Sequence, residues 1–138
     1  MRQVFLDTGA FVALLVAEDR MHARAVQLFE LASTENWALF TTNVVVVETY
    51  TVLLARAREG RRVAIAFLDA SEASGGALTI ERIRIEDESA AAALVRAHTD
   101  KKYSLCDASS FVVMERLGIT DAISFDRHFR EYGRFTIL

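Results

Sequence analysis

Short apolar runs alternate along the chain with longer segments in which apolar residues recur every three or four positions. The runs predict strands and the spaced segments predict amphipathic helices. The expected strands are Gln3–Leu6, Trp37–Thr41, Leu78–Ile85, Asp121–Phe125 and Phe135–Leu138. A helix is expected directly after Asp7, and the later helices are expected over His22–Thr34, Asn43–Arg58, Arg61–Ala73, Glu86–His98, Ser104–Leu117 and Arg127–Tyr132.

Glycines and small polar residues indicate where several of these helices begin and end. Thr42 or Asn43 is expected to cap the Asn43–Arg58 helix, and Gly60 is expected to end it. The Ser-Gly-Gly segment at 74–76 is expected to stop the next helix, and Gly118 to stop the helix that begins at Ser104.

Strands that are separated by helices predict a mostly parallel sheet covered on both faces, with right-handed crossovers. The expected fold is therefore a three-layer α/β/α domain with about five strands. Arg82 and Arg84 suit an edge strand, where charge discourages aggregation. The length of 138 residues, without a linker or a repeat, predicts a single domain over residues 1–138.

Composition excludes several protein classes. Cys106 is the only cysteine, so no intramolecular disulfide is expected, and a reducing cytoplasm fits best. Charged residues at 18–20 interrupt the first apolar stretch, and no membrane segment is expected. The net charge of −3 gives no general attraction to nucleic acid, but clustered acids neutralised by a metal would change that balance.

Four carboxylates stand where an ordinary core would not place them: Asp7, Glu48, Asp107 and Asp126. Asp7 and Asp126 follow predicted strands, and ligands of open α/β sheets gather at the carboxyl ends of strands. All four side chains can therefore meet in one acidic pocket, which a hard cation would stabilise.

Each acid also has a purely structural interpretation. Asp7 and Asp126 can cap the helices that follow them, and Asp107 can form a capping box with Ser104. Glu48 is expected on the apolar side of its helix, near Val44 and Val52, with Thr49 and Arg56 on the more polar edge. A buried carboxylate must be protonated, paired with an arginine or bound to a cation. One metal site explains the four acids jointly.

Four ordered segments resemble the acidic motifs of the PIN-domain ribonucleases. These segments are Asp7–Phe11, Thr42–Glu48, Ser104–Ser109 and Ser124–Phe129. The similarity covers nearly the whole chain and is greatest to small single-domain members, including the VapC-type toxins. Cys106 occupies a position where the family more often has a small or hydroxyl-bearing residue.

The resemblance implies an endoribonuclease that depends on one or two Mg²⁺ or Mn²⁺ ions and hydrolyses RNA with a metal-activated water, leaving a 5′ phosphate. It implies Asp7 and Asp107 as the most direct ligands, with Asp126 and Glu48 completing the site directly or through water. Glu48 is alternatively the general base. Thr8 or Ser124 would hold a ligand oxygen or the scissile phosphate.

RNA that approaches an acidic pocket needs nearby cations. Arg127 is the expected phosphate contact, together with its neighbours His128 and Arg130. The densest basic cluster has a competing interpretation as a solvated helix end, and consists of Arg56, Arg58, Arg61 and Arg62. Zinc is not expected, because the three histidines lack partners at ligand spacing.

The resemblance also implies a toxin role, with an antitoxin as partner. The Asn43–Arg58 helix is apolar nearly all round, so a face left over for a partner or for homodimerisation is expected. Two other classes stay open, a phosphorelay receiver and a catalytically silent module that binds metal or RNA. An aspartate-nucleophile phosphatase is disfavoured by Gly9, and a Cys106 nucleophile by the lack of an activating histidine.

Overall fold

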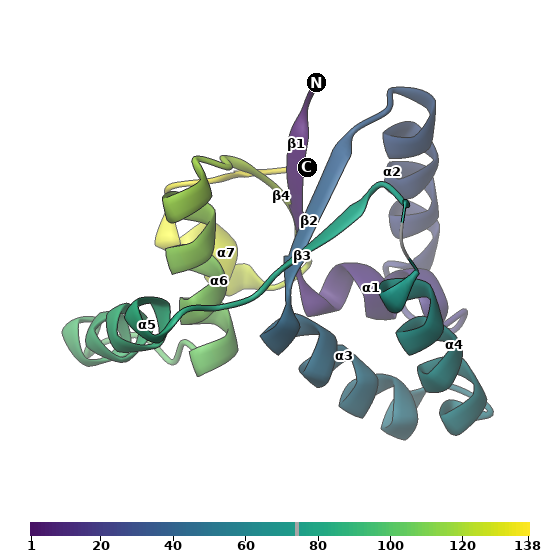
Figure 1. Cartoon of the computed structure of the whole chain (residues 1–138). Helices are drawn as coiled ribbons and strands as arrows, with labels where there is room; N and C mark the ends of the chain where they lie inside the picture. The colour runs from purple at the N-terminus through teal and green to yellow at the C-terminus, as the bar shows by residue number, and fades with distance from the viewer. Residues whose placement is uncertain (74) are drawn as a thin grey trace.

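A computed structural model describes residues 1–73 and 75–138 and has a five-stranded sheet at its centre (Figure 1). The strand order is β3-β2-β1-β4-β5 and all four pairings are parallel. The strands are β1 (Gln3–Leu6), β2 (Ala38–Thr42), β3 (Leu78–Glu81), β4 (Asp121–Ile123) and β5 (Thr136–Ile137). The predicted mostly parallel sheet of about five strands is confirmed.

In the part of the chain that the structure describes, seven helices connect and cover these strands. They are α1 (Thr8–Leu15), α2 (His22–Thr34), α3 (Asn43–Arg56), α4 (Gly60–Glu72), α5 (Ile85–Ala97), α6 (Leu105–Leu117) and α7 (Arg127–Tyr132). In Figure 1, α1, α2 and α4 lie on one side of the sheet, and α5, α6 and α7 lie on the other. None of the helices among these residues is long and apolar enough to cross a membrane.

The central strand explains where the site forms. Val4, Phe5 and Leu6 in β1 are fully or almost fully buried, as expected for a parallel strand with helices on both faces. The chain order reverses at β1, because β2 lies on one side of it and β4 on the other. Such a switch point leaves an opening at the carboxyl ends of the two strands. Asp7 follows β1 directly at this opening.

The predicted role of Gly60 is wrong. Helix α3 ends at Arg56, close to the expected end near Arg58, but Gly60 begins α4 instead of ending α3. A Cβ atom at position 60 would collide with the backbone carbonyl of Leu54, so α4 can start against the last turn of α3 only with glycine there. The predicted stop at 74–76 includes Ser74, which lies outside the described residues.

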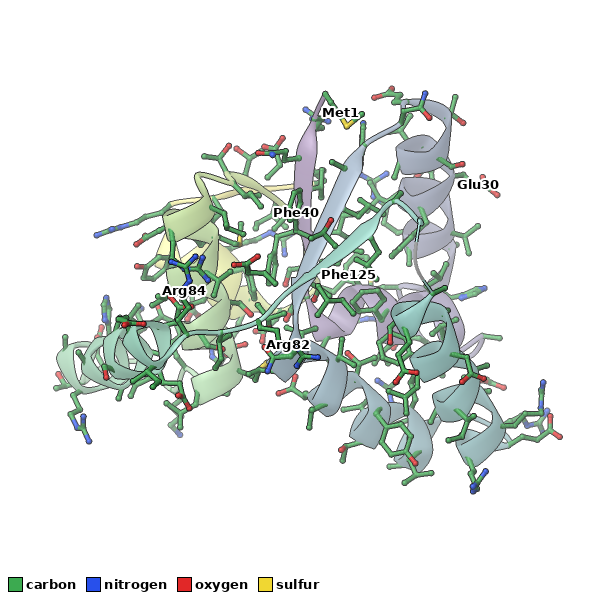
Figure 2. The ribbon with its side chains drawn as sticks, viewed as in Figure 1. Met1, Glu30, Phe40, Arg82, Arg84 and Phe125 are labelled. Atoms are coloured by element: carbon green, nitrogen blue, oxygen red, sulfur yellow. The ribbon has the colours of Figure 1, made fainter. Side chains whose placement is uncertain are left out.

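The third strand is an edge strand, as predicted, but it is shorter. It ends at Glu81, and Ile85 is the first residue of α5. Figure 2 shows Arg82 and Arg84 on the segment that leads from β3 to α5. This segment is anchored by Arg116 of α6, which forms two hydrogen bonds with Asp87, of 2.9 and 2.8 Å, and one of 2.9 Å with Glu81.

Candidate active site

The four predicted acids come together in one pocket of about 440 Å³. They come from four separate elements: Asp7 follows β1, Glu48 lies in α3, Asp107 lies in the first turn of α6, and Asp126 precedes α7. The lining residues are Asp7, Thr8, Gly9, Val12, Asp19, Arg20, Met21, Glu48, Val52, Arg56, Asp107, Phe125 and Asp126. The folded chain thus gathers side chains that lie up to 119 positions apart, from position 7 to position 126.

Asp7 does not act as a helix cap. It occupies the N-cap position of α1, but its side chain accepts no capping hydrogen bond there. Instead, Oδ2 of Asp7 accepts a hydrogen bond of 3.1 Å from the Ser124 hydroxyl. Burial and then the negative charge of Asp107 raise the pKa of Asp7 to about 7, although hydrogen bonds from Thr8 and Ser124 oppose this rise. The ionised form of Asp7 is therefore unfavourable in the folded protein, and a nearby cation would stabilise it.

Ser124 lies beneath the pocket and joins two of its acids. Its side chain is completely buried, and its oxygen also accepts a hydrogen bond of 3.1 Å from the Asp126 amide. Ser124 is not one of the lining residues. The expectation that its hydroxyl touches the scissile phosphate does not fit this geometry, whereas holding an oxygen of Asp7 does.

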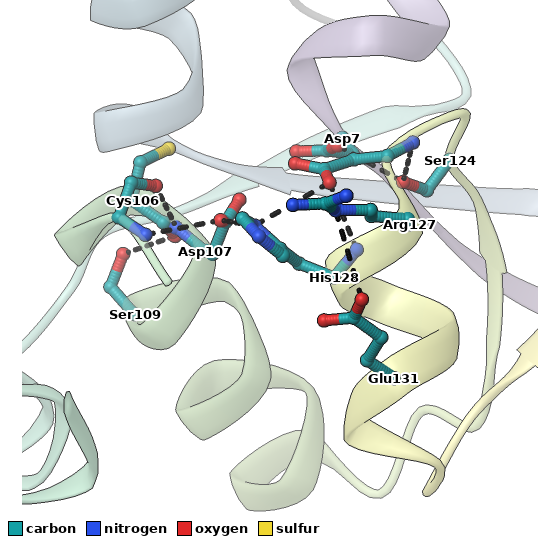
Figure 3. A network of polar contacts seen from close by, with 10 residues as sticks. Asp7, Cys106, Asp107, Ser109, Ser124, Arg127, His128 and Glu131 are labelled. Atoms are coloured by element: carbon teal, nitrogen blue, oxygen red, sulfur yellow. Dashed lines mark hydrogen bonds and ion pairs between the residues drawn. The ribbon is translucent and has the colours of Figure 1, made fainter. Parts of the chain in front are cut away.

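Asp107 is both a helix-capping residue and one of the acids of the pocket. The Ser104 amide donates to Oδ2 of Asp107 at 3.1 Å, and the Asp107 amide donates to the Ser104 hydroxyl at 2.9 Å, which completes a capping box. His128 Nδ1 lies 2.8 Å from the same Oδ2 (Figure 3). Burial raises the pKa of Asp107, and the hydrogen bond with His128 opposes that rise.

Asp126 also serves as a cap and a pocket residue. Its Oδ1 accepts a hydrogen bond of 2.9 Å from the His128 amide in the first turn of α7, as predicted. Unlike Asp7, the side chain keeps about a third of its surface exposed. One carboxylate can therefore hold the helix end and face the pocket at the same time.

The predicted orientation of α3 is partly wrong. The buried stripe of this helix consists of Val45, Thr49 and Leu53, whereas Glu48 is half-buried at its border. Thr49, expected on the polar edge, is completely buried. Helix α3 packs against α1, α4 and α6, and this packing, not the polarity of Thr49, sets the buried side. Glu48 consequently reaches the pocket from its wall.

Cys106 lies close to this wall. Burial and then the negative charges of Glu48 and Asp7 raise the pKa of the Cys106 thiol far above its usual range. A thiol held in this way is not a nucleophile at neutral pH.

The arginines divide differently from the sequence prediction. Arg56 lines the pocket and pairs with Asp19 at 3.0 Å, but Arg58 lies 3.9 Å from Glu18 and Arg62 lies 2.8 Å from Glu59. Three of the four arginines at positions 56–62 thus lie beside different acids, and of these three Arg56 lines the pocket.

Arg127 is the arginine expected at the pocket, but Arg20 lies there instead. The Arg127 side chain is 78% exposed, lies 3.7 Å from Glu131 and is not among the lining residues. Arg20, predicted only to interrupt an apolar run, lines the pocket. No sequence pattern marks Arg20, because it lies in the short connection between α1 and α2.

The setting of His128 differs from the prediction. The sequence predicts this residue among the cations that contact phosphate, but its ring lies 2.8 Å from Asp107 and 3.5 Å from Asp126. Atoms of these three residues lie within 4.8 Å of one another, as a group that could hold a metal ion requires. The signal was available, because a residue two positions after a cap lies in the first turn of the helix, beside the capping carboxylate.

The donor set fits a hard cation. The pocket offers four carboxylates, and Thr8 contributes a hydroxyl that is buried and has no hydrogen-bond partner among residues 1–73 and 75–138. Oxygen donors of this kind suit Mg²⁺ and Mn²⁺, whereas zinc sites in proteins are built mainly from cysteine and histidine. A cation here would also offset the repulsion that raises the pKa of Asp7.

Comparisons with known proteins agree on one family. The family model described as PIN domain matches residues 4–135. The chain is 32% identical over 130 residues to "23S rRNA-specific endonuclease VapC20" of Mycobacterium tuberculosis (strain H37Rv), with 94% of each protein covered. The VapC20 protein of strain CDC 1551 / Oshkosh gives the same identity and coverage.

Two solved structures have the same fold. The crystal structure of Mycobacterium tuberculosis VapC20, described as a sarcin-ricin loop cleaving toxin, superposes with a TM-score of 0.87 at 30% identity, and 98% of each chain is covered. VapBC2 from Rickettsia felis, bound to a promoter DNA fragment, superposes with a TM-score of 0.70 at 11% identity, with 99% of this chain and 97% of that chain covered. At that identity the second match shows the fold alone.

Proposed function

The chain belongs to the PIN-domain family, and from this premise we propose that it is a metal-dependent endoribonuclease whose active site is the acidic pocket. The observation that carries the proposal is the convergence of Asp7, Glu48, Asp107 and Asp126 from four elements. Four carboxylates in one pocket repel one another, so at neutral pH the arrangement needs either a proton on one of them or a counter-charge, and a bound cation supplies the latter.

The proposed metal is Mg²⁺ or Mn²⁺. Asp7 and Asp107 would be its most direct ligands, and Asp126 and Glu48 would complete the site directly or through water. When bound, the ion supplies Lewis acidity to the phosphodiester and lowers the pKa of a coordinated water.

The remaining tasks fall to the side chains of the chain itself. Ser124 fixes Asp7 and Asp126 relative to each other. The free Thr8 hydroxyl is available to donate a hydrogen bond to an oxygen in the pocket. Glu48, half-buried at the wall, is the proposed acceptor for the proton of the attacking water. Arg20 and Arg56 are placed to contact phosphates at the rim, and Arg127 would reach RNA farther out.

The biological role we propose is that of a toxin of a type II toxin–antitoxin pair, which acts in the cytoplasm. Support comes from the full-length similarity to VapC20, which is named as a 23S rRNA-specific endonuclease. We propose RNA as the substrate of this chain, an antitoxin protein as its inhibitor, and a homodimer as its assembly. Val47 and Leu54 on α3 are exposed apolar side chains that a partner would cover. Sedimentation that shows only monomer at high concentration would exclude the homodimer.

Two alternative functions are weighed against the nuclease by different observations. A phosphorelay receiver is disfavoured, because receivers have the strand order 2-1-3-4-5, whereas this sheet has the order 3-2-1-4-5. A catalytically silent module that binds metal or RNA keeps the same acids and is separated from the nuclease by activity.

The test is RNA cleavage by the purified protein with Mg²⁺ or Mn²⁺, with and without EDTA. Cleavage is expected only with the metal, and Asp7→Asn is expected to lower it by more than about 100-fold, since even outer-shell residues of metal sites cost 10- to 100-fold. Asp69→Asn, which changes an exposed acid of α4, is the matched control and should retain full activity. Equal cleavage by the wild type and Asp7→Asn would overturn the proposal.

A further inference from the structure

His128 is held by contacts with the start of its own helix, with α6 and with the connection that precedes α6. Its backbone amide donates to Asp126 at the start of α7, and its ring reaches Asp107 on α6. Figure 3 shows the ring beside Asp107, with Ser124 and Asp7 on the far side of the network. One residue thus contacts two of the four pocket acids: its main chain bonds to Asp126, and its ring lies 2.8 Å from Asp107 and 3.5 Å from Asp126.

The side-chain contacts of Asp107 involve one of its two carboxylate oxygens. Oδ2 of Asp107 accepts from the Ser104 amide at 3.1 Å and lies 2.8 Å from His128 Nδ1. When Asp107 is ionised, as a carboxylate that binds a cation is, its oxygens only accept hydrogen bonds, and Nδ1 of His128 is then the donor. Oδ1 has no hydrogen-bond donor in the part of the chain that the structure describes. Both donors therefore hold one oxygen and leave the other available to a cation.

The ring is also held from its other side. Tyr103 packs edge-on against it, with ring centroids 5.3 Å apart and planes at 82°. Tyr103 in turn packs against Phe111, and the completely buried Phe129 anchors α7 to the same aromatic cluster. Because these contacts already fix the ring, the His128 side chain loses no conformational freedom when the pocket binds its ligand.

We propose that His128 is a positioning residue that, by donating from Nδ1 to Oδ2 of Asp107, orients this carboxylate toward the metal. This inference rests on the proposed metal-dependent function. Histidine and carboxylate commonly pair in this way around metal sites, where the outer partner fixes the ligand without binding the ion. Neither the family match nor the similarity to VapC20 assigns this role.

The test uses two substitutions of His128 that each place an amide nitrogen where one of the two ring nitrogens lies. The amide nitrogen of Asn can take the place of Nδ1, whereas that of Gln reaches the place of Nε2. The measurement is the affinity for Mn²⁺ at a fixed pH, by titration calorimetry or by the electron paramagnetic resonance of free Mn²⁺. His98→Ala is the matched control, since His98 also packs against Tyr103, at 5.6 Å, but its ring bonds to the Leu94 carbonyl and to no carboxylate.

We expect His128→Ala and His128→Gln to bind Mn²⁺ roughly 10- to 100-fold more weakly than the wild type, and His128→Asn to stay within a few-fold of it. Saturating Mn²⁺ should restore most of the kcat of His128→Ala, because the ligand is misplaced and not lost. Wild-type affinity in a folded His128→Ala variant would overturn the inference.

Rescue by Gln instead of Asn would also overturn it, since it would show that the interaction comes from the Nε2 position and not from Nδ1. If His128→Ala does not fold, the Asn and Gln pair still decides. A wild-type protein that binds no Mn²⁺ would instead refute the proposed function, so the two failures are distinguishable.

Discussion

The Ser124 hydroxyl donates a hydrogen bond of 3.1 Å to Oδ2 of Asp7, and the two residues lie 117 positions apart in the chain. The same hydroxyl oxygen accepts from the Asp126 amide. Ser124 therefore connects the carboxyl end of β1 to the segment that follows β4, and sets the distance between two of the pocket acids.

Replacement of this serine by alanine should impair both the site and the fold. Ser124→Ala leaves a buried carboxylate oxygen and an amide without their partner, which is expected to cost about 1–3 kcal/mol of unfolding free energy. The loss of orientation should lower activity by roughly 10- to 100-fold. Urea unfolding and RNA cleavage measure the two effects.

Ser71→Ala is the matched control for this change. Ser71 donates to the Leu68 carbonyl at 2.8 Å within α4, outside the pocket. This variant should keep wild-type activity. A Ser124→Ala variant with both wild-type stability and wild-type activity would contradict the assigned role.

The raised pKa of Asp7 predicts a pH dependence of the metal-free protein. In the folded state Asp7 is protonated up to about pH 7, whereas in the unfolded chain it ionises near its ordinary value of 3.8. Unfolding between these values releases a proton, so stability falls as pH rises from about 4 to about 7. The contribution of this one group is at most on the order of 4 kcal/mol.

Asp7→Asn should remove this part of the slope. Urea unfolding in EDTA at several pH values between 5 and 8 measures it, and the wild type should lose more stability than the variant over this range. Added Mg²⁺ should reduce the difference at the upper end. Parallel curves for the two proteins would show that Asp7 does not titrate in this range.

Arg116 predicts an effect on stability alone. It holds the buried Asp87 with two hydrogen bonds, and these bonds lower the pKa of Asp87. Because the folded-state pKa is lowered, this contribution is present above the ordinary value near 3.8 and is lost as pH falls below it. Arg116→Ala leaves a buried charge and should cost about 3 kcal/mol at pH 7.

The Asp87→Asn/Arg116→Ala double variant is the control for this pair. It should lose less stability than the sum of the two single losses, because the uncompensated charge is absent. The affinity for Mn²⁺ should remain that of the wild type in all three variants, since neither residue lines the pocket. Additive losses would contradict a direct interaction.

Arg20 predicts an effect on RNA binding. It lines the rim of the pocket but is not next to the four acids in sequence. Arg20→Ala should raise KM, leave kcat near the wild-type value, and reduce the salt dependence of RNA affinity by about one counterion. Arg61→Ala, an exposed arginine that does not line the pocket, should change none of these quantities.

Local chemistry predicted much of this fold and site. Helix α2 has the predicted ends, His22 and Thr34, and Ser104, Thr42 and Asp126 cap the helices for which they were named. Strands separated by helices leave few topologies, so the approach of Asp7 and Asp126 at one sheet end could be predicted from order alone.

Long-range packing accounts for the errors. The buried side of α3 depends on how the helix fits between its neighbours, so Thr49 is buried and Glu48 reaches only the wall. Arg20 and His128 reach the site because the connection after α1 and the first turn of α7 lie beside it. The spacing of apolar residues along the sequence does not predict contacts of this kind. The place of Arg20 could be recognised only with coordinates, whereas that of His128 follows from the cap at Asp126.

The most direct test of a shared ion is a crystal of the protein grown with Mn²⁺ and examined by anomalous scattering. The account predicts a peak in the pocket within about 2.1 Å of carboxylate oxygens of Asp7 and Asp107, the distance typical of small divalent ions. A peak elsewhere, or a well-ordered pocket without any at saturating Mn²⁺, would contradict it.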